Sequence, residues 1–227
     1  MKKRVLFIGN SHTYLHYMPQ MLEQLVLAGD CHFELEADQS VGEAVSLEWH
    51  WNSASTRRKM RSRNWDFIVL QERSGGPLEN LESFREHARL LHSEIDEIGA
   101  ATILYMTWAN QNRPGDAGLL ADAYRKMATE LKAGLAPVGM AWTGVHQSSP
   151  ELVLHHQDGR HASPIGAYLT ACVFYAVLTH KSPLGLPATF DIEGKKRPDQ
   201  DQAQARLLQN AVWETHRIAD FGFRISD

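Results

Sequence analysis

The chain has 227 residues, which is enough for one substantial domain with a buried core. Hydrophobic residues make up 43% of it and charged residues 22%, proportions that are ordinary for a globular protein. A formal net charge of −4 and a pI of about 6.3 disfavour nucleic acids and acidic membrane surfaces as partners. We therefore expect a single domain over residues 1–227 with no nucleic-acid or membrane partner, and the composition leaves the oligomeric state open.

The start of the chain has the charge pattern of a secretion signal but not its length. Basic residues 2–4 precede the apolar run Val5–Ile8, which ends at Gly9, well short of the roughly 7–15 apolar residues that a signal peptide needs. We therefore expect a cytoplasmic protein. The two cysteines, Cys31 and Cys172, form no C-x-x-C pair, so cysteine-based metal or redox chemistry is not expected, and Cys172 is predicted to be a buried thiol.

Apolar runs typical of strands alternate with segments of helical periodicity. Strands are predicted at Lys3–Ile8, His32–Ala37, Asp66–Leu70, Ala101–Met106 and Val138–Thr143. Helices are predicted around residues 18–26, 77–98, 119–131, 165–178 and 200–219, with a looser helical region over 43–63. The pair Ser163-Pro164 supplies a helix N-cap followed by proline at the first helical position.

Five strands alternating with helices predict a parallel sheet with helices on both faces, a three-layer α/β/α fold. We expect the flavodoxin-like strand order 2-1-3-4-5. In such sheets, ligands bind beyond the carboxyl ends of the strands, where the strand order reverses. That position lies between the first and third strands, so the loops at Ser11 and Gln71 would be neighbours.

Two segments together carry the chemistry of acyl transfer. The turn Gly9-Asn10-Ser11-His12-Thr13 follows the first strand, and taken alone it is typical of a helix cap or a phosphate-binding turn. Much later, Asp158 and His161 stand three residues apart. The two segments supply a nucleophile, a base and an orienting acid. The chain has no G-x-G-x-x-G, Walker A or G-x-S-x-G motif, which disfavours nucleotide binding and the α/β-hydrolase fold.

These residues resemble the SGNH, or GDSL-like, hydrolase superfamily. Residues 9–13 are similar to block I, Gly42 stands where the family has its block II glycine, and Asp158-x-x-His161 matches block V. The resemblance implies that Ser11 is the nucleophile, His161 the general base and Asp158 the residue that orients it. The backbone N–H groups of Ser11 and Gly42 would then donate to the oxyanion.

The third block departs from the usual pattern. Leu70-Gln71-Glu72 stands where the family has a Gly-x-Asn-Asp segment, and it resembles a subgroup with a Leu-Gln-Glu block. In that subgroup Gln71 would replace the asparagine as third oxyanion donor, and Glu72 would be structural or a substrate contact. The departure leaves open a catalytically silent fold that binds a carbohydrate or an anionic ligand.

The expected function is a serine esterase for a small acetyl or short acyl ester, with a carbohydrate as one candidate alcohol. A lysophospholipase, thioesterase or acyltransferase with the same triad is the alternative. Trp108 and Asn110 follow the fourth strand and are predicted substrate contacts, although most tryptophans pack in cores. No cofactor is implied.

Two clusters each have a structural interpretation beside a functional one. The basic residues within 57–63 fit the solvated face of a helix or a site for an anionic partner. The histidines at 146, 155 and 156 invite a zinc hypothesis, but they lack the spacing of helical metal ligands. We predict no metal site.

Overall fold

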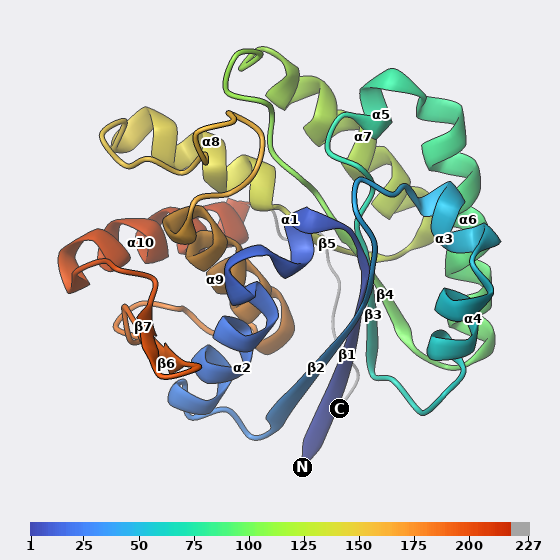
Figure 1. Ribbon diagram of the computed structural model, residues 1–227, viewed down its shortest axis with the longest axis horizontal. Helices are drawn as coiled ribbons and strands as arrows, with labels where there is room; N and C mark the ends of the chain where they lie inside the picture. The colour runs from blue at the N-terminus through green and yellow to red at the C-terminus, as the bar shows by residue number, and fades with distance from the viewer. Residues whose placement is uncertain (219–227) are drawn as a thin grey trace.

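The computed structural model describes residues 1–218, and its centre is a parallel sheet (Figure 1). Its five strands are, in spatial order, β2 (Glu34–Val41), β1 (Lys2–Gly9), β3 (Phe67–Leu70), β4 (Ala101–Tyr105) and β5 (Gly134–Ala136). This is the predicted order 2-1-3-4-5. The carboxyl ends of β1 and β3 are therefore neighbours, and the backbone N–H of Gln71 donates to the carbonyl of Ile8 at 2.9 Å.

Helices cover both faces of the sheet. They are α1 (Ser11–Tyr14), the 3₁₀ turn η1 (Leu15–Tyr17), α2 (Met18–Ala28), α3 (Leu47–Asn52), α4 (Ala54–Met60), α5 (Gly76–Glu79), α6 (Leu81–Glu97), α7 (Asp116–Leu131), α8 (Val138–Ser148), α9 (Pro164–Thr179) and α10 (Gln202–Ile218). None of these described helices has the length and apolarity that crossing a bilayer requires.

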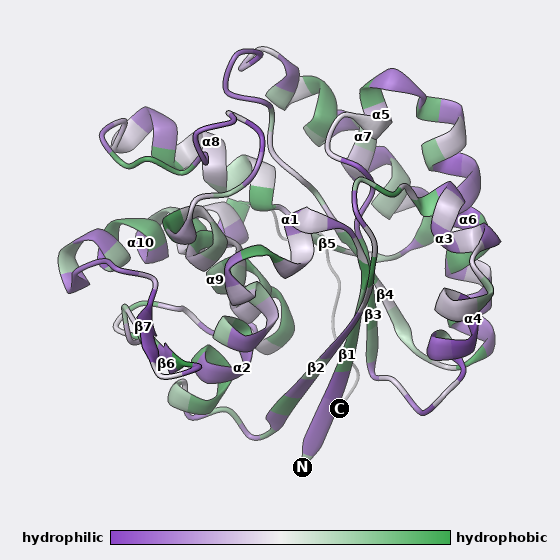
Figure 2. Cartoon of the chain, viewed as in Figure 1, coloured by the Kyte–Doolittle hydropathy of each residue, from purple (hydrophilic) through white to green (hydrophobic). Residues whose placement is uncertain are grey.

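Alternate residues of the central strands enter two separate cores, because successive side chains of a strand point to opposite faces. Val5 and Phe7 pack with α2, α8, α9 and α10, whereas Leu6 and Ile8 pack with α3, α4, α6 and α7. Figure 2 shows the resulting apolar band along the inner strands. The three-layer α/β/α fold is thus confirmed.

Helix α9 is the most deeply buried helix of the first core. The predicted cap forms, since the Ser163 hydroxyl oxygen accepts the N–H of Gly166 at 3.1 Å and Pro164 occupies the first helical position. Every residue from 166 to 178 is buried, and Cys172 among them is the predicted buried free thiol. The whole helix therefore acts as a core element, which explains its near-uniform hydrophobicity.

The fifth strand was predicted at the wrong place. Residues 138–143 begin α8, and the strand is the three-residue segment Gly134–Ala136 just before it. Val138, Ala141, Trp142 and Val145 are buried at helical spacing, so the apolar run that suggested a strand is one face of a helix.

Other segments refine the prediction. The looser helical region over 43–63 divides into α3 and α4, each capped by a serine, and the last helix begins at Gln202, with residue 219 outside the described part. A hairpin of β6 (Phe190–Ile192) and β7 (Lys195–Arg197) was not predicted. Glu193 and Gly194 form its turn with φ angles of 55° and 72°, the left-handed conformation of a two-residue hairpin turn.

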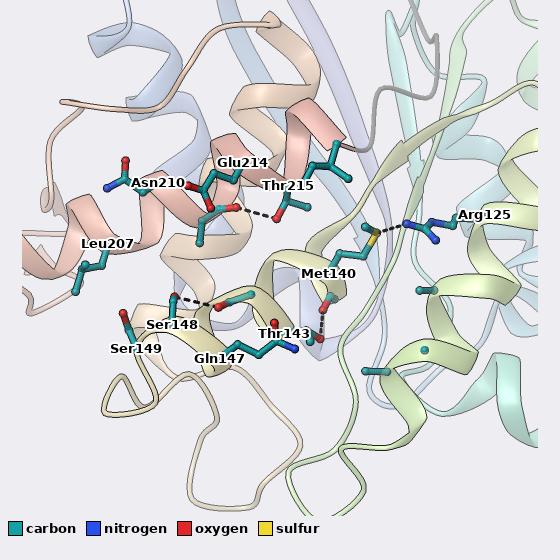
Figure 3. Close-up of a pocket in the computed structure, with 17 residues that line it drawn as sticks. Arg125, Met140, Thr143, Gln147, Ser148, Ser149, Leu207, Asn210, Glu214 and Thr215 are labelled. Carbon is teal, nitrogen blue, oxygen red and sulfur yellow. Dashed lines mark hydrogen bonds between the residues drawn. The ribbon is translucent and has the colours of Figure 1, made fainter.

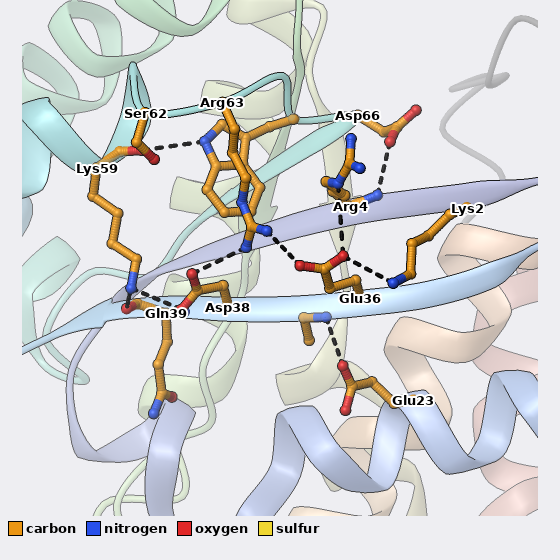
Figure 4. Close-up of polar contacts among 12 residues, drawn as sticks. Lys2, Arg4, Glu23, Glu36, Asp38, Gln39, Lys59, Ser62, Arg63 and Asp66 are labelled. Atoms are coloured by element: carbon orange, nitrogen blue, oxygen red, sulfur yellow. Dashed lines mark hydrogen bonds and ion pairs between the residues drawn. The ribbon is translucent and has the colours of Figure 1, made fainter.

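Four of the five basic residues within 57–63 form ion pairs inside the chain, and Figure 4 shows those of Lys59 and Arg63. Lys59 and Arg63 pair with carboxylates of the edge strand β2, whereas Arg57 and Arg61 pair with a carboxylate of α6. The pairs are Lys59–Asp38, Arg63–Glu36, Arg63–Asp38, Arg57–Glu94 and Arg61–Glu94. Charges along an edge strand also discourage pairing with another chain. These contacts favour the structural interpretation of the cluster over a site for an anionic partner.

Candidate active site

The turn that carries Ser11 is shaped by very close packing. β1 ends at Gly9, Asn10 caps α1, and the Asn10 Oδ1 accepts the N–H of His12 at 3.1 Å. A Cβ at Gly9 would stand 2.4 Å from the Gln71 Oε1 and 2.8 Å from the Thr13 Oγ1. Only glycine fits such an approach. The turn therefore places Ser11 at the carboxyl end of the central strand.

Asn10 and Gln71 form a reciprocal pair of side-chain amides beneath this turn. The Gln71 Oε1 accepts the Asn10 N–H at 2.8 Å and the Thr13 hydroxyl at 3.0 Å. The Gln71 Nε2 donates to the Asn10 Oδ1 at 3.0 Å and to the Glu72 carbonyl at 2.7 Å. Both hydrogens of the Gln71 amide are thus engaged, and the side chain is fully buried.

The structure brings Ser11, His161 and Asp158 together in one hydrogen-bonded chain. The Ser11 Oγ lies 2.9 Å from the His161 Nε2, and the His161 Nδ1 lies 2.6 Å from the Asp158 Oδ2. Because a carboxylate only accepts, Nδ1 carries the ring proton and Nε2 is free to accept from the serine. This is the tautomer that a general base needs toward a serine hydroxyl.

Asp158 is held as a carboxylate. Its Oδ1 accepts the backbone N–H groups of Arg160 at 2.8 Å and His161 at 3.0 Å. Desolvation acts to raise the pKa of Asp158, but the hydrogen bonds from His161 and from these backbone groups outweigh it and lower the pKa well below its usual range. The residue thus remains charged beside the imidazole at any pH near neutrality.

The segment that bears Asp158 and His161, residues 155–162, is anchored by the loop after β4. The Trp108 Nε1 donates to the Arg160 carbonyl at 2.9 Å, and the Gln111 N–H donates to the Gly159 carbonyl at 2.8 Å. The His155 Nε2 donates to the Ala109 carbonyl at 3.0 Å. Three contacts therefore fix the position of the imidazole relative to the sheet.

His16 connects the same segment to the nucleophile turn. Its Nε2 donates to the Ala162 carbonyl at 3.0 Å. His16 and Tyr17 have φ angles of 57° and 60°, a left-handed conformation that costs each of them on the order of 1 kcal/mol. Two consecutive strained residues next to Ser11 are therefore maintained by the surrounding contacts. Nothing in their sequence signals this conformation.

His12 packs directly against the proposed base. Its ring centroid lies 5.2 Å from that of His161 and 4.9 Å from that of Trp108. Desolvation, reinforced by the nearby His161, lowers the pKa of His12 to about 3. His12 is consequently neutral near pH 7, so it adds no full positive charge beside an imidazolium forming on His161.

Two of the predicted oxyanion donors are engaged elsewhere. Gln71 has no free amide hydrogen, because both serve Asn10 and Glu72. The Gly42 N–H donates to the Gly9 carbonyl at 3.3 Å and extends the pairing of β1 with β2. In this conformation neither group faces the site as a donor. The Ser11 N–H, at the first helical position, has no intrahelical acceptor and stays the predicted donor.

Two of the three predicted substrate contacts, Trp108 and Glu72, lie in positions that do not favour contact with a ligand. Trp108 is 2% exposed and stacks on Trp142 with ring centroids 4.0 Å apart, so its ring presents no face to a ligand. Glu72 is buried, and its carboxylate accepts the backbone N–H groups of Leu47 at 3.1 Å and Arg73 at 2.7 Å. This supports its structural interpretation. Asn110 is half-buried in the loop after β4, and its substrate role stays a prediction.

Desolvation raises the pKa of Glu72, against the opposing effect of its two hydrogen bonds from the backbone of Leu47 and Arg73.

His50 was not predicted to be a site residue, but its Nε2 donates to the Gly9 carbonyl at 2.9 Å. Burial lowers the pKa of His50, which favours the neutral ring. Its Nδ1 then accepts from the Thr56 hydroxyl at 3.0 Å. A helical histidine with no motif around it gives no sequence signal for this contact.

Within residues 1–218, no three histidine, cysteine, aspartate or glutamate side chains gather as a metal ion would require. His146 and His155 stack with ring centroids 5.4 Å apart, and the His155 Nε2 is hydrogen-bonded to the Ala109 carbonyl.

A cavity of about 760 Å³ lies between α7, α8 and α10 (Figure 3). The residues that line it include none of Ser11, Asp158 and His161.

Comparison with known proteins gives structural relatives only. No family model and no curated protein matches the chain. A candidate SGNH hydrolase from Slackia heliotrinireducens is 26% identical, with a TM-score of 0.67 over 78% of this chain and 100% of that one. A DUF4886 family protein from Bacteroides uniformis is 20% identical, with a TM-score of 0.77 over 97% and 96% of the two chains.

An acetyl xylan esterase is 17% identical, with a TM-score of 0.57 over 76% of this chain and 98% of that one. At this identity the similarity concerns the fold, not the substrate. In its fold, the chain is therefore similar to SGNH hydrolases, including one that is 26% identical to it.

Proposed function

We propose that this protein is a serine esterase that hydrolyses a small acetyl or short acyl ester through an acyl-enzyme at Ser11. The observation that carries the proposal is the chain of short contacts from the Ser11 Oγ through the His161 ring to Asp158. A serine hydroxyl is a poor nucleophile unless a base removes its proton, and His161 lies at the distance and in the tautomer for that role.

The reaction divides into two displacements. The Ser11 Oγ attacks the ester carbonyl while its proton passes to the His161 Nε2, and Asp158 stabilises the imidazolium. The imidazolium then protonates the departing alkoxide, which leaves as an alcohol and yields the acyl-enzyme. Water, deprotonated by His161, attacks the acyl carbonyl, and the carboxylic acid leaves as Ser11 recovers its proton. The Ser11 N–H would donate to the oxyanion in both steps.

Structural relatives support a short acyl group and a carbohydrate alcohol as the first substrates to test. They include an acetyl xylan esterase and a family 3 carbohydrate esterase from Clostridium thermocellum. A lipase/acylhydrolase from Enterococcus faecalis shares the fold as well, so longer acyl groups belong in the same assay.

The test is hydrolysis of p-nitrophenyl acetate, butyrate and octanoate by the wild-type protein and Ser11→Ala. We expect kcat/KM to be highest for acetate and to fall with acyl length. Ser11→Ala should lower kcat on the order of 10⁶-fold, to the background rate. Highest kcat/KM for octanoate would favour the lysophospholipase or thioesterase alternative. Unchanged turnover by Ser11→Ala would contradict the proposed nucleophile.

A further inference from the structure

The Asp158 carboxylate lies between two imidazoles, and the proposed reaction uses one of them. The Asp158 Oδ2 is 2.6 Å from the His161 Nδ1 and 3.5 Å from the His156 Nδ1. The second contact becomes a salt bridge when the His156 ring is protonated on both nitrogens, because a cation then faces the carboxylate. The oxygen atom that orients the proposed base is therefore also within ion-pair distance of a second histidine.

The backbone of residues 156–161 fixes this arrangement. The His156 N–H donates to the His161 carbonyl at 2.8 Å, and the two flanking residues pair as an antiparallel bridge. Between them, the Gly159 N–H donates to the His156 carbonyl at 2.9 Å and closes a turn. Gly159 has a φ angle of 69°, a left-handed conformation that glycine adopts without strain. The two histidines thus stand opposite each other at the ends of one short loop, with Asp158 between them.

Asp158 has the capacity to bind both rings. Its Oδ1 accepts two backbone N–H groups of the loop, so the carboxylate is held independently of either imidazole. Its Oδ2 accepts from the His161 Nδ1 and keeps a second lone pair. The His156 side chain is 51% exposed, so it exchanges protons with water. An exposed imidazole gains its second proton close to neutral pH, where an esterase of this kind would work.

The other histidines that face this loop are held in the neutral form. Desolvation lowers the pKa of His12 to about 3, and it also lowers the pKa of His155. Desolvation lowers the pKa of His16 as well, against the hydrogen bond to the Ala162 carbonyl, and the neighbouring His156 lowers it further. These three rings therefore add no full charge beside Asp158 near pH 7.

The remaining charges near the loop are constant. The hydrogen bonds to Asp158 keep it ionised, and Arg160 in the loop and Arg197 on β7 stay protonated in proteins. Arg197 lies close enough to His16 to help lower its pKa. Between about pH 5 and 8, the charge that changes next to the pair of Asp158 and His161 is therefore that of His156.

We infer that His156 is a positioning residue that acts on His161 through Asp158, and that protonation of His156 weakens His161 as a base. The inference rests on the proposed function of the Ser11 site. While His156 is neutral, the charge of Asp158 stabilises the imidazolium that forms on His161. Once His156 is protonated, the same carboxylate also pairs with it, and an imidazolium on His161 is less stable. The two rings then titrate as a coupled pair.

The experiment compares His156→Gln, which is neutral at every pH, with His156→Lys, which stays positively charged. The measured quantity is the midpoint of the acid limb of kcat/KM for p-nitrophenyl acetate. Relative to the wild type, this midpoint should rise in His156→Gln and fall in His156→Lys, with about 0.5–1 pH unit between the two variants. A purely structural role of His156 would not move the midpoint in opposite directions. His32→Gln, at an exposed histidine outside the loop, should keep the wild-type midpoint.

An NMR titration separates this inference from the esterase proposal, because it needs no turnover. The ring Hε1 resonance of His161, assigned by its loss in His161→Ala, is followed with pH in the wild type and in both variants of His156. We expect its midpoint to move in the same two opposite directions. If the wild type hydrolyses no ester, such shifts still support the action of His156 on His161, while the esterase proposal fails. Midpoints that coincide in the three proteins, or that move in one direction in both variants, overturn the inference.

Discussion

At the scale of single residues, the glutamine after β3 has a role different from the one its position in the sequence suggests. Gln71 makes four hydrogen bonds from a fully buried amide, and two of them involve Asn10, the residue before the proposed nucleophile. Buried amides are stable only when they are hydrogen-bonded in this way. Gln71 therefore supports the turn from below.

Gln71→Met tests this role. The methionine fills the same space but leaves the Asn10 N–H and the Thr13 hydroxyl without their acceptor, so the free energy of unfolding should fall by about 1–3 kcal/mol per group left unpaired. Urea unfolding measures this loss. Gln209→Met, which removes an equally buried glutamine bonded to Tyr168 and Leu186, should destabilise the protein to a similar extent without lowering kcat.

If Gln71 were an oxyanion donor, the outcome would be different. Gln71→Met would then lower kcat on the order of 100-fold to 1,000-fold while leaving stability nearly unchanged. The destabilisation that we predict, with a kcat loss no larger than about tenfold in protein that remains folded, separates the two roles.

Some features of the site can be predicted from the sequence, and others depend on packing in the folded protein. The proximity of Ser11 and Gln71 follows from the strand order, because β1 and β3 are neighbours, whereas the contact of Ser11 with His161 was expected from the resemblance to SGNH hydrolases. The direction of a side chain does not follow in this way. Trp108 stands at the predicted place, but its ring turns inward onto Trp142, and Gln71 turns toward Asn10. Those directions are decided by packing partners that are remote in sequence.

At the scale of elements, strands and helices follow from periodicity wherever the segment is long. β1 and α7 lie close to their predicted positions, whereas the helix predicted over 77–98 is divided at Asn80 into α5 and α6. The three-residue β5 is too short to show a period, and the apolar face of α8 that follows was mistaken for it. The β6–β7 hairpin was not predicted, because its turn places Glu193 in a left-handed conformation that no sequence pattern indicates.

The loop after β4 is the element that positions the imidazole, and Trp108→Phe tests this. The phenylalanine keeps an aromatic ring but loses the bond from Nε1 to the Arg160 carbonyl. We expect kcat to fall by about tenfold with little change in KM, since a displacement of about 1 Å near reacting groups can cost on the order of 100-fold.

Trp65→Phe is the matched control for this change. It removes a similar bond from a buried indole to the Lys59 carbonyl, away from residues 155–162, and should leave kcat unaltered. A rise in KM for Trp108→Phe with unchanged kcat would instead indicate that Trp108 contacts the substrate.

At the scale of the whole molecule, the fold ties stability to pH through histidines that are buried in the neutral form. His12 has a pKa of about 3 in the folded protein against an ordinary value of about 6.5. At a pH between these two pKa values, His12 is protonated in the unfolded chain but not in the folded protein. Stability is therefore complete above about pH 6.5 and decreases as the pH falls, by about 1.4 kcal/mol per pH unit for such a group.

His12→Phe should reduce this dependence. Between pH 7 and pH 5 the free energy of unfolding of the variant should fall by about 2 kcal/mol less than that of the wild type. Urea unfolding at the two pH values gives the comparison, and other buried histidines such as His50 affect both proteins equally. His32→Gln, at an exposed position, should retain the wild-type dependence. Equal pH dependence of His12→Phe and the wild type would contradict the low pKa.

The central claim is that Ser11 is activated by His161, and labelling by a small fluorophosphonate tests it most directly. Such a probe phosphonylates an activated serine with little regard for the natural substrate. Intact-mass analysis should find one adduct on the wild type, none on Ser11→Ala and much slower labelling of His161→Ala. An unlabelled wild type, or a Ser11→Ala protein that still gains the adduct, would contradict the account.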